Sequence, residues 1–191
     1  HFMMSCLDES YDVVFLAGYH AGPGEPLANM DHSFSGRAVG CLKINGHYMN
    51  ESTTNAALAG DYGVPVALVA GDSGLRRQLI DQKQMPWVEF VTTKESLSRY
   101  AAKFPPQKKL REDTAAAVKR VLESDLKALP LYRVKAPIRL AIDFKTTAMA
   151  EMVAQLPMVE RISGTEAEVI CQNMTEVECA ISAITGLAGI A

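Results

Sequence analysis

The sequence predicts an α/β protein with a mostly parallel sheet and flanking helices, followed by a smaller α+β C-terminal unit. Residues 13–17 (VVFLA) and 65–70 (PVALVA) are two short, almost wholly apolar runs, which is typical of strands buried on both faces of a parallel sheet. A segment suited to a helix, residues 51–61, lies between them, and such alternation of strands and helices favours an α/β layer. The C-terminal part alternates strands and helices again and contains no histidine.

The elements of the first part follow from turn and capping residues. Asn45-Gly46 is a strong hairpin signal between a strand over 37–44 and a return strand at His47 and Tyr48. Asn50 is suited to cap the helix over 51–61, and Gly63 to end it. The other elements expected here are strands over 11–17, 65–70 and 87–91, a helix over 75–82, and a short helix over 95–103.

A boundary is expected near Pro105-Pro106 and the basic residues that follow them. We therefore predict an α/β metal-site domain over 1–103 and an α+β domain over 104–191 that serves packing, specificity or assembly. The expected elements of the second domain are helices over 112–129, 147–155 and 175–186 and strands over 138–144 and 166–171.

Composition excludes several classes of function. The net charge of −3 and a pI of about 5.8 argue against a nucleic-acid or anionic-membrane partner. No apolar run approaches the ~20 residues of a membrane-spanning helix, and no signal peptide is evident. The four cysteines lack a CxxC pair, so we expect free thiols in a reducing compartment, the cytoplasm.

Three polar clusters are the strongest chemical signal. His20 follows the first buried strand, where ligands bind in such sheets, although a histidine there can simply bond a loop carbonyl. His32 is flanked by Asp31, which can orient an imidazole, although a solvated loop histidine fits equally. Glu51 shares a helical face with Asn55, and a carboxylate in the first turn also stabilises a helix by itself.

Two further groups have alternative interpretations. Asp72 follows the strand 65–70 and can be a metal ligand or a helix N-cap, of which capping is the commoner role. Lys94, Ser98 and Arg99 flank the predicted short helix and can bind an anion or form a solvated face. One histidine and one glutamate are too few for a catalytic zinc ion, which takes about three protein ligands plus water.

Together the stretches FLAGYHAGPGEPLANMDHS, INGHYMNESTTNAALAGDYGVPVALVAGD and TTKESLSRYAA resemble the DppA-type D-aminopeptidases of bacterial dipeptide-permease operons. The resemblance covers essentially the whole chain. It implies a cytoplasmic enzyme with two zinc ions that removes N-terminal D-residues, notably D-Ala, from short peptides, and a homodecamer of stacked five-fold rings. By the same resemblance His20 and Glu51 bind zinc, His32 is catalytic, and Asn55 lies near the site, where we assign it to substrate binding.

The chain departs from the family pattern before His20. Family members begin with a strand that carries an Asp-x-Glu metal pair, followed by another ligand histidine, and Asp8-Glu9 is a different pattern. We therefore expect the zinc site to be completed by an N-terminal fragment that is retained as a separate chain, lost, or not included in this sequence. The alternatives are a non-catalytic ring-forming protein of the same fold and a metallohydrolase of another amide or ester.

Overall fold

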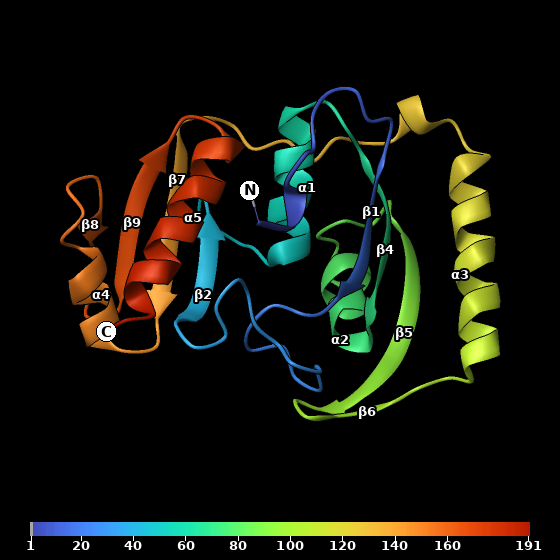
Figure 1. Ribbon diagram of the computed structural model, residues 1–191, viewed down its shortest axis with the longest axis horizontal. Coiled ribbons are helices and arrows are strands. Elements are labelled where there is room, and N and C mark those ends of the chain that lie inside the picture. Colours follow the sequence, from blue (N-terminus) through green and yellow to red (C-terminus); the bar gives the residue numbers. More distant parts are fainter. Residues whose placement is uncertain (1) are drawn as a thin grey trace.

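A computed structural model describes residues 2–191, and its strands form two sheets joined through a central helix (Figure 1). The first sheet runs parallel through β1, β4 and β5 and ends in an antiparallel edge strand, β6. The prediction of an α/β fold with a mainly parallel sheet is therefore confirmed. In spatial order its strands are β1 (Val14–Tyr19), β4 (Val66–Asp72), β5 (Glu89–Ser98) and β6 (Ala101–Lys103).

The second sheet is antiparallel and takes strands from both parts of the sequence. The Asn45-Gly46 turn, with φ of +50° and +81°, joins β2 to β3 as the hairpin signal predicted. In spatial order its strands are β3 (His47–Tyr48), β2 (Val39–Ile44), β7 (Ile138–Phe144), β9 (Glu166–Cys171) and β8 (Glu160–Arg161).

Helix α1 (Glu51–Asp61) lies between the two sheets (Figure 1). It contacts β1 and β4 on one side and α5 (Met174–Ala188) on the other, so every residue from Glu51 to Gly60 is buried. Small side chains permit this close packing. A Cβ on Gly60 would lie 2.0 Å from the Tyr132 carbonyl oxygen, which leaves glycine as the residue that fits.

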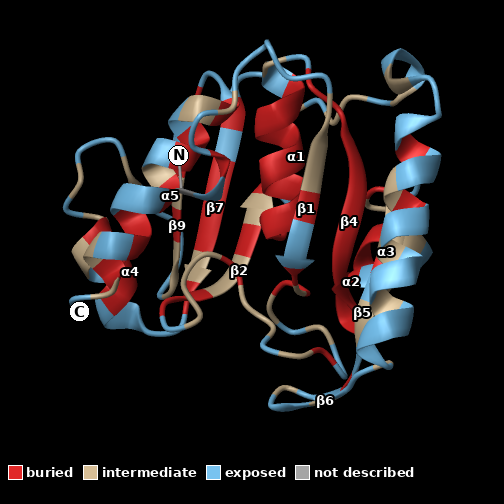
Figure 2. Cartoon of the chain, turned by 45° about the vertical axis from the view of Figure 1, so that its right-hand side comes forward, coloured by how far each residue is buried: buried red, intermediate tan, exposed pale blue. Residues whose placement is uncertain are grey.

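The cores on the two faces of β4 explain why its sequence is apolar from Val66 to Gly71, with Asp72 at its end. All seven of its residues are buried (Figure 2). One face belongs to the main core around α1, and the other packs against Ala117 and Val121 of α3 (Gln107–Leu122). Helix α4 (Thr147–Val153) packs with α5 against β7 and β9.

The prediction of a short helix over 95–103 is wrong. Strand β5 continues to Ser98, and residues 101–103 return as β6. The segment pairs with itself as a hairpin, Glu95 with Lys103 and Ser96 with Ala102, and this pairing overrides its helix-compatible residues. A contact with a distant part of the sequence adds to it, because the Ser96 N–H donates to Ser73 Oγ at 2.9 Å. Helix α3 also starts earlier than predicted, directly after Pro106.

Other elements lie close to their predicted positions. Asp72 caps α2 (Ser73–Arg76), which continues as a π-helical turn over Arg77–Asp81. Short 3₁₀ turns occupy Phe2–Met4 and Leu126–Ala128. The division at residue 103 stays a prediction. The antiparallel sheet crosses this position, since β2 pairs with β7, and α3 packs against β4 and β5.

Within the part of the chain that the structure describes, no helix has the length and apolarity needed to cross a membrane. All four cysteines are free thiols, as the lack of a CxxC pair indicated.

Candidate metal centre

Three side chains that are far apart in sequence converge beside the carboxyl end of β1. His20 follows β1 directly, His32 lies in the loop that leads to β2, and Glu51 is the first residue of α1. One ligand-type atom of each lies within 4.8 Å of the others. The strand end and the helix start therefore bring together the three residues that the sequence singled out for metal binding and catalysis.

The two imidazoles meet the two oxygens of the same carboxylate. His20 Nε2 lies 3.5 Å from Glu51 Oε2, and His32 Nε2 lies 3.8 Å from Glu51 Oε1. The rings stack, with centroids 4.1 Å apart and planes inclined by 17°. Glu51 is buried, whereas both histidines are partly exposed, so the cluster faces solvent over a buried carboxylate.

Backbone carbonyls orient both rings. The Nδ1 of His20 lies 3.1 Å from the Ala21 carbonyl oxygen, and the Nδ1 of His32 lies 2.7 Å from that of Met30. A carbonyl only accepts, so each neutral ring donates from Nδ1 and keeps a lone pair on Nε2. Both Nε2 atoms are thus the ones free to bind a metal ion or accept a proton.

The oxygens of Glu51 have different surroundings. Oε1 accepts a hydrogen bond from the Phe34 N–H at 2.7 Å, whereas Oε2 faces His20. The carboxylate also lies in the first turn of α1, where the helix dipole favours negative charge. Oε2 with His20 Nε2 is therefore the best-placed pair of ligand atoms.

Asp72 holds the loop around these histidines in place. Its carboxylate caps α2, accepts from the Ala21 N–H at 3.2 Å and the Asn29 N–H at 3.0 Å, and accepts from Ser96 Oγ at 2.6 Å. Burial alone would raise the pKa of Asp72, but these hydrogen bonds lower it below its ordinary value. Of the two roles considered for Asp72, capping is confirmed.

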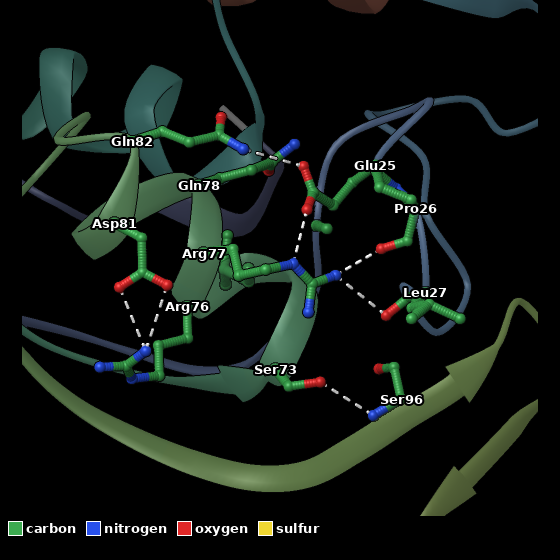
Figure 3. Close-up of polar contacts among 12 residues, drawn as sticks. Glu25, Pro26, Leu27, Ser73, Arg76, Arg77, Gln78, Asp81, Gln82 and Ser96 are labelled. Atoms are coloured by element: carbon green, nitrogen blue, oxygen red, sulfur yellow. Dashed lines mark hydrogen bonds and ion pairs between the residues drawn. The ribbon is translucent and has the colours of Figure 1, made fainter.

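The outer part of the same loop is fastened to the π-helical turn (Figure 3). Arg77 Nε donates to Glu25 Oε1 at 2.9 Å, and its Nη2 donates to the carbonyl oxygens of Pro26 and Leu27. Gln82 adds a bond to the second Glu25 oxygen at 3.3 Å. The loop between β1 and β2 is therefore held along its length, although it contains several glycines and prolines.

Asn55 lies one helical turn below Glu51 and is fully buried. Its Nδ2 donates to the Tyr19 hydroxyl at 2.7 Å, and its Oδ1 has no hydrogen-bond partner among residues 2–191. Burial raises the pKa of Tyr19 to about 12, so this hydroxyl stays neutral. Asn55 thereby ties α1 to the end of β1, and its assignment to substrate binding stays a prediction.

Zinc fits this donor set. Imidazole nitrogen and carboxylate oxygen are both ordinary zinc ligands. However, an imidazole binds metal in the plane of its ring, and one ion cannot lie in the planes of two stacked rings. The geometry thus suits His20 and Glu51 as ligands of one ion, with His32 beside it.

Sequence reasoning missed two residues near the centre. Glu178 of α5 is 1% exposed and lies within the predicted helix over 175–186, between the buried residues Val177 and Ile181. Its acidic character within an apolar helix was the available signal. Arg99, considered only as part of a helix or anion site, is instead bonded to Asp31, next to His32.

The fold and this donor set define the class of protein: an α/β protein with a candidate metal centre at the carboxyl end of a strand. The model of the D-aminopeptidase family, Peptidase_M55, matches residues 1–183. The chain belongs to this D-aminopeptidase family.

Two relatives support this membership. The chain is 32% identical to a D-aminopeptidase of Bacillus subtilis strain 168, over 97% of its own length and 66% of that protein. It is also similar to the solved structure of the Zn-dependent D-aminopeptidase DppA from Bacillus subtilis, a self-compartmentalizing protease, with a TM-score of 0.84 and 29% identity. That match covers 99% of this chain and 68% of the solved one. The chain therefore spans about two thirds of the length of the relatives it matches.

Proposed function

We propose that this chain carries part of the active site of a zinc-dependent aminopeptidase that removes N-terminal D-residues, of the D-Ala type, from short peptides. The observation that carries the proposal is the convergence of His20, His32 and Glu51 within 4.8 Å. Membership of the D-aminopeptidase family gives the reaction class. The zinc dependence of the Bacillus subtilis D-aminopeptidase supports the choice of metal.

The residues of the centre divide the chemistry between them. Zinc, when bound, supplies Lewis acidity that polarises the scissile carbonyl and activates water for attack. His20 Nε2 and Glu51 Oε2 would hold it. His32 Nε2 keeps a free lone pair beside this position, which suits it to accept a proton from the attacking water and return it to the leaving amine.

A dinuclear centre needs further ligands. Three side chains cannot complete two sites that each take about four ligands including water. We propose that the others come from a segment outside these 191 residues, carried on the same polypeptide or as a separate fragment. In the described chain β1 is an edge strand, and a cleft of about 580 Å³ lies along it, lined by residues that include Met3, Tyr11 and Tyr19. An added strand has room to pair there.

Assembly and location are part of the same proposal. The Bacillus subtilis relative is described as self-compartmentalizing, which supports a homo-oligomer, and stacked five-fold rings are our specific expectation. We also propose a cytoplasmic location. The free thiols are compatible with that location.

The proposal is tested by measuring zinc content, chain composition and turnover on one preparation. Native mass spectrometry is expected to find about two zinc ions per complete site, and a companion fragment if the polypeptide has been cleaved. D-Ala-Gly-Gly should be hydrolysed and L-Ala-Gly-Gly should not, and a chelator should abolish the activity until zinc is restored.

Three outcomes would contradict the proposal. A metal-free oligomer without turnover would favour the non-catalytic ring-forming protein. Equal hydrolysis of both tripeptides would favour a metallohydrolase of other amides. Full ligation of two ions within this chain would contradict the additional segment.

A further inference from the structure

We propose that Arg99, at the turn between β5 and β6, is a positioning residue for His32. The inference rests on the proposed role of His32 in proton transfer. It concerns residues far apart in sequence, since Arg99 and its partner Asp31 are separated by 68 positions. The contacts between the turn and the histidine form an unbroken chain.

The first link is between the turn and the loop. The Arg99 guanidinium forms an ion pair with the Asp31 carboxylate and also donates to the Asp31 carbonyl oxygen. The Arg99 carbonyl oxygen accepts from the Met30 N–H at 2.8 Å and from Asn29 Nδ2 at 3.1 Å. Residues 29–31 are thus held on both backbone and side-chain atoms.

The second link is between the loop and the imidazole. The Met30 carbonyl oxygen accepts from His32 Nδ1 at 2.7 Å, while the His32 N–H donates to the Ala21 carbonyl oxygen at 3.2 Å. Met30 therefore links the two residues: its N–H donates to the Arg99 carbonyl oxygen, and its own carbonyl oxygen accepts from His32 Nδ1. A displacement of this residue moves the acceptor that sets the ring orientation and tautomer.

The backbone of Met30 needs such an anchor. Its φ is +55°, in the left-handed region that side chains disfavour, and Phe34 on the other side of His32 has φ of +58°. Conformations of this kind persist only when surrounding contacts hold them. The second oxygen of Asp31 adds one contact by accepting from the Gly24 N–H at 2.9 Å.

The consequence is functional, because His32 must keep its Nε2 lone pair directed at the centre. Without the guanidinium, the carboxylate and the carbonyl oxygen of Asp31 lose their partner, whereas the Arg99 carbonyl oxygen still accepts from the Met30 N–H. The peptide group that joins Met30 to Asp31 can then rotate, which moves the Met30 carbonyl oxygen away from the His32 Nδ1–H. The imidazole would then populate both tautomers and several orientations, only one of which presents a proton-accepting Nε2. We expect this to lower the rate of the chemical step more than substrate binding.

The test compares Arg99→Ala with Arg99→Lys and a matched control. Arg161→Ala serves as control, because Arg161 also combines an ion pair with bonds to turn carbonyls, and its side chain is 34% exposed against 35% for Arg99. Arg99→Ala is expected to lower kcat roughly ten- to a hundredfold with little change in KM and in zinc content. Arg99→Lys should recover most of the activity by keeping a charge beside Asp31, and Arg161→Ala should behave as the unchanged protein.

A readout that needs no turnover separates this inference from the proposed function. The ¹⁵N chemical shifts of the His32 ring, measured in chelator-treated protein at pH 8.5, should show one Nδ1-protonated tautomer. In Arg99→Ala they should move toward a mixture, and Asp31→Ala should give the same spectrum. Absence of turnover in the unchanged protein would count against the proposed function alone. An unchanged tautomer in Arg99→Ala and Asp31→Ala would overturn the positioning role.

Discussion

Replacing His32 with alanine is expected to lower turnover by about 10²–10⁴-fold while zinc content stays near that of the unchanged protein. The reason is the geometry of the cluster. The His32 ring stacks on that of His20, so an ion in the His20 ring plane lies outside that of His32. Loss of the imidazole should therefore remove the proton acceptor and leave the metal ligands in place.

Glu51→Gln is the matched variant for this prediction. Glutamine has the same shape and can still accept the hydrogen bond from the Phe34 N–H, but it lacks the negative charge that attracts the metal ion. Zinc content should fall with turnover in Glu51→Gln, whereas only turnover should fall in His32→Ala. Both quantities are read from the same samples by elemental analysis and by hydrolysis of D-Ala-Gly-Gly. Loss of zinc from His32→Ala would make His32 a ligand.

Replacing Glu178 with glutamine is expected to stabilise the protein at high pH by about 3 kcal/mol. Both carboxylate oxygens of Glu178 are buried without a hydrogen-bond partner among the described residues, in a helix that packs on α1. Burial, with a smaller contribution from Glu51, raises the pKa of Glu178 from 4.5 to about 7. A buried carboxyl of this kind favours its neutral form.

The direction of the pH dependence follows from the raised pKa. Below pH 4.5 the carboxyl is protonated in both folded and unfolded chains, so it does not make the free energy of unfolding depend on pH. Between pH 4.5 and 7 the unfolded chain releases the proton and the folded chain retains it, so folding stability falls as the pH rises. Above pH 7 the loss of folding stability is complete and no longer grows with pH, because the folded protein then holds a buried charge.

Urea unfolding at pH 4.5, 6 and 8.5, with chelator present throughout, measures this effect. The gain in stability of Glu178→Gln should be near zero at pH 4.5 and should grow to its full value at pH 8.5. Glu123→Gln is the control, since Glu123 is exposed at the end of α3 and should change stability by less than about 0.5 kcal/mol. A gain that does not vary with pH would contradict the assignment of the raised pKa to Glu178.

Local signals predicted several elements well. The bounds of α1, β7 and β9 match the expected ranges, because each combines a clear apolar pattern with a cap or a turn at its ends. The failure at residues 95–103 has the opposite cause. Glu95, Leu97 and Lys103 are compatible with a helix, but the pairing of β5 with β6 decides their conformation. Ser96, within the same segment, is also held by the distant residues Asp72 and Ser73.

The same division holds for the candidate site. Residue type and position after a strand or at a helix start were enough to single out His20, His32 and Glu51. The contact between Asp31 and Arg99 had no local signal, because it depends on the strand that replaced the predicted helix. The buried position of Glu178 likewise depends on packing between α5 and α1.

The sequence by itself determined the α/β class, the order of most elements and the chemistry of the candidate ligands, because apolar periodicity, capping and side-chain type are properties of short stretches. Only the tertiary structure decided which oxygen of Glu51 faces which imidazole, that the two rings stack, and that Arg99 anchors the loop of His32. These features depend on contacts between residues that are 12 to 68 positions apart in the sequence. Such contacts are fixed by the pairing of strands and the burial of α1 between two sheets.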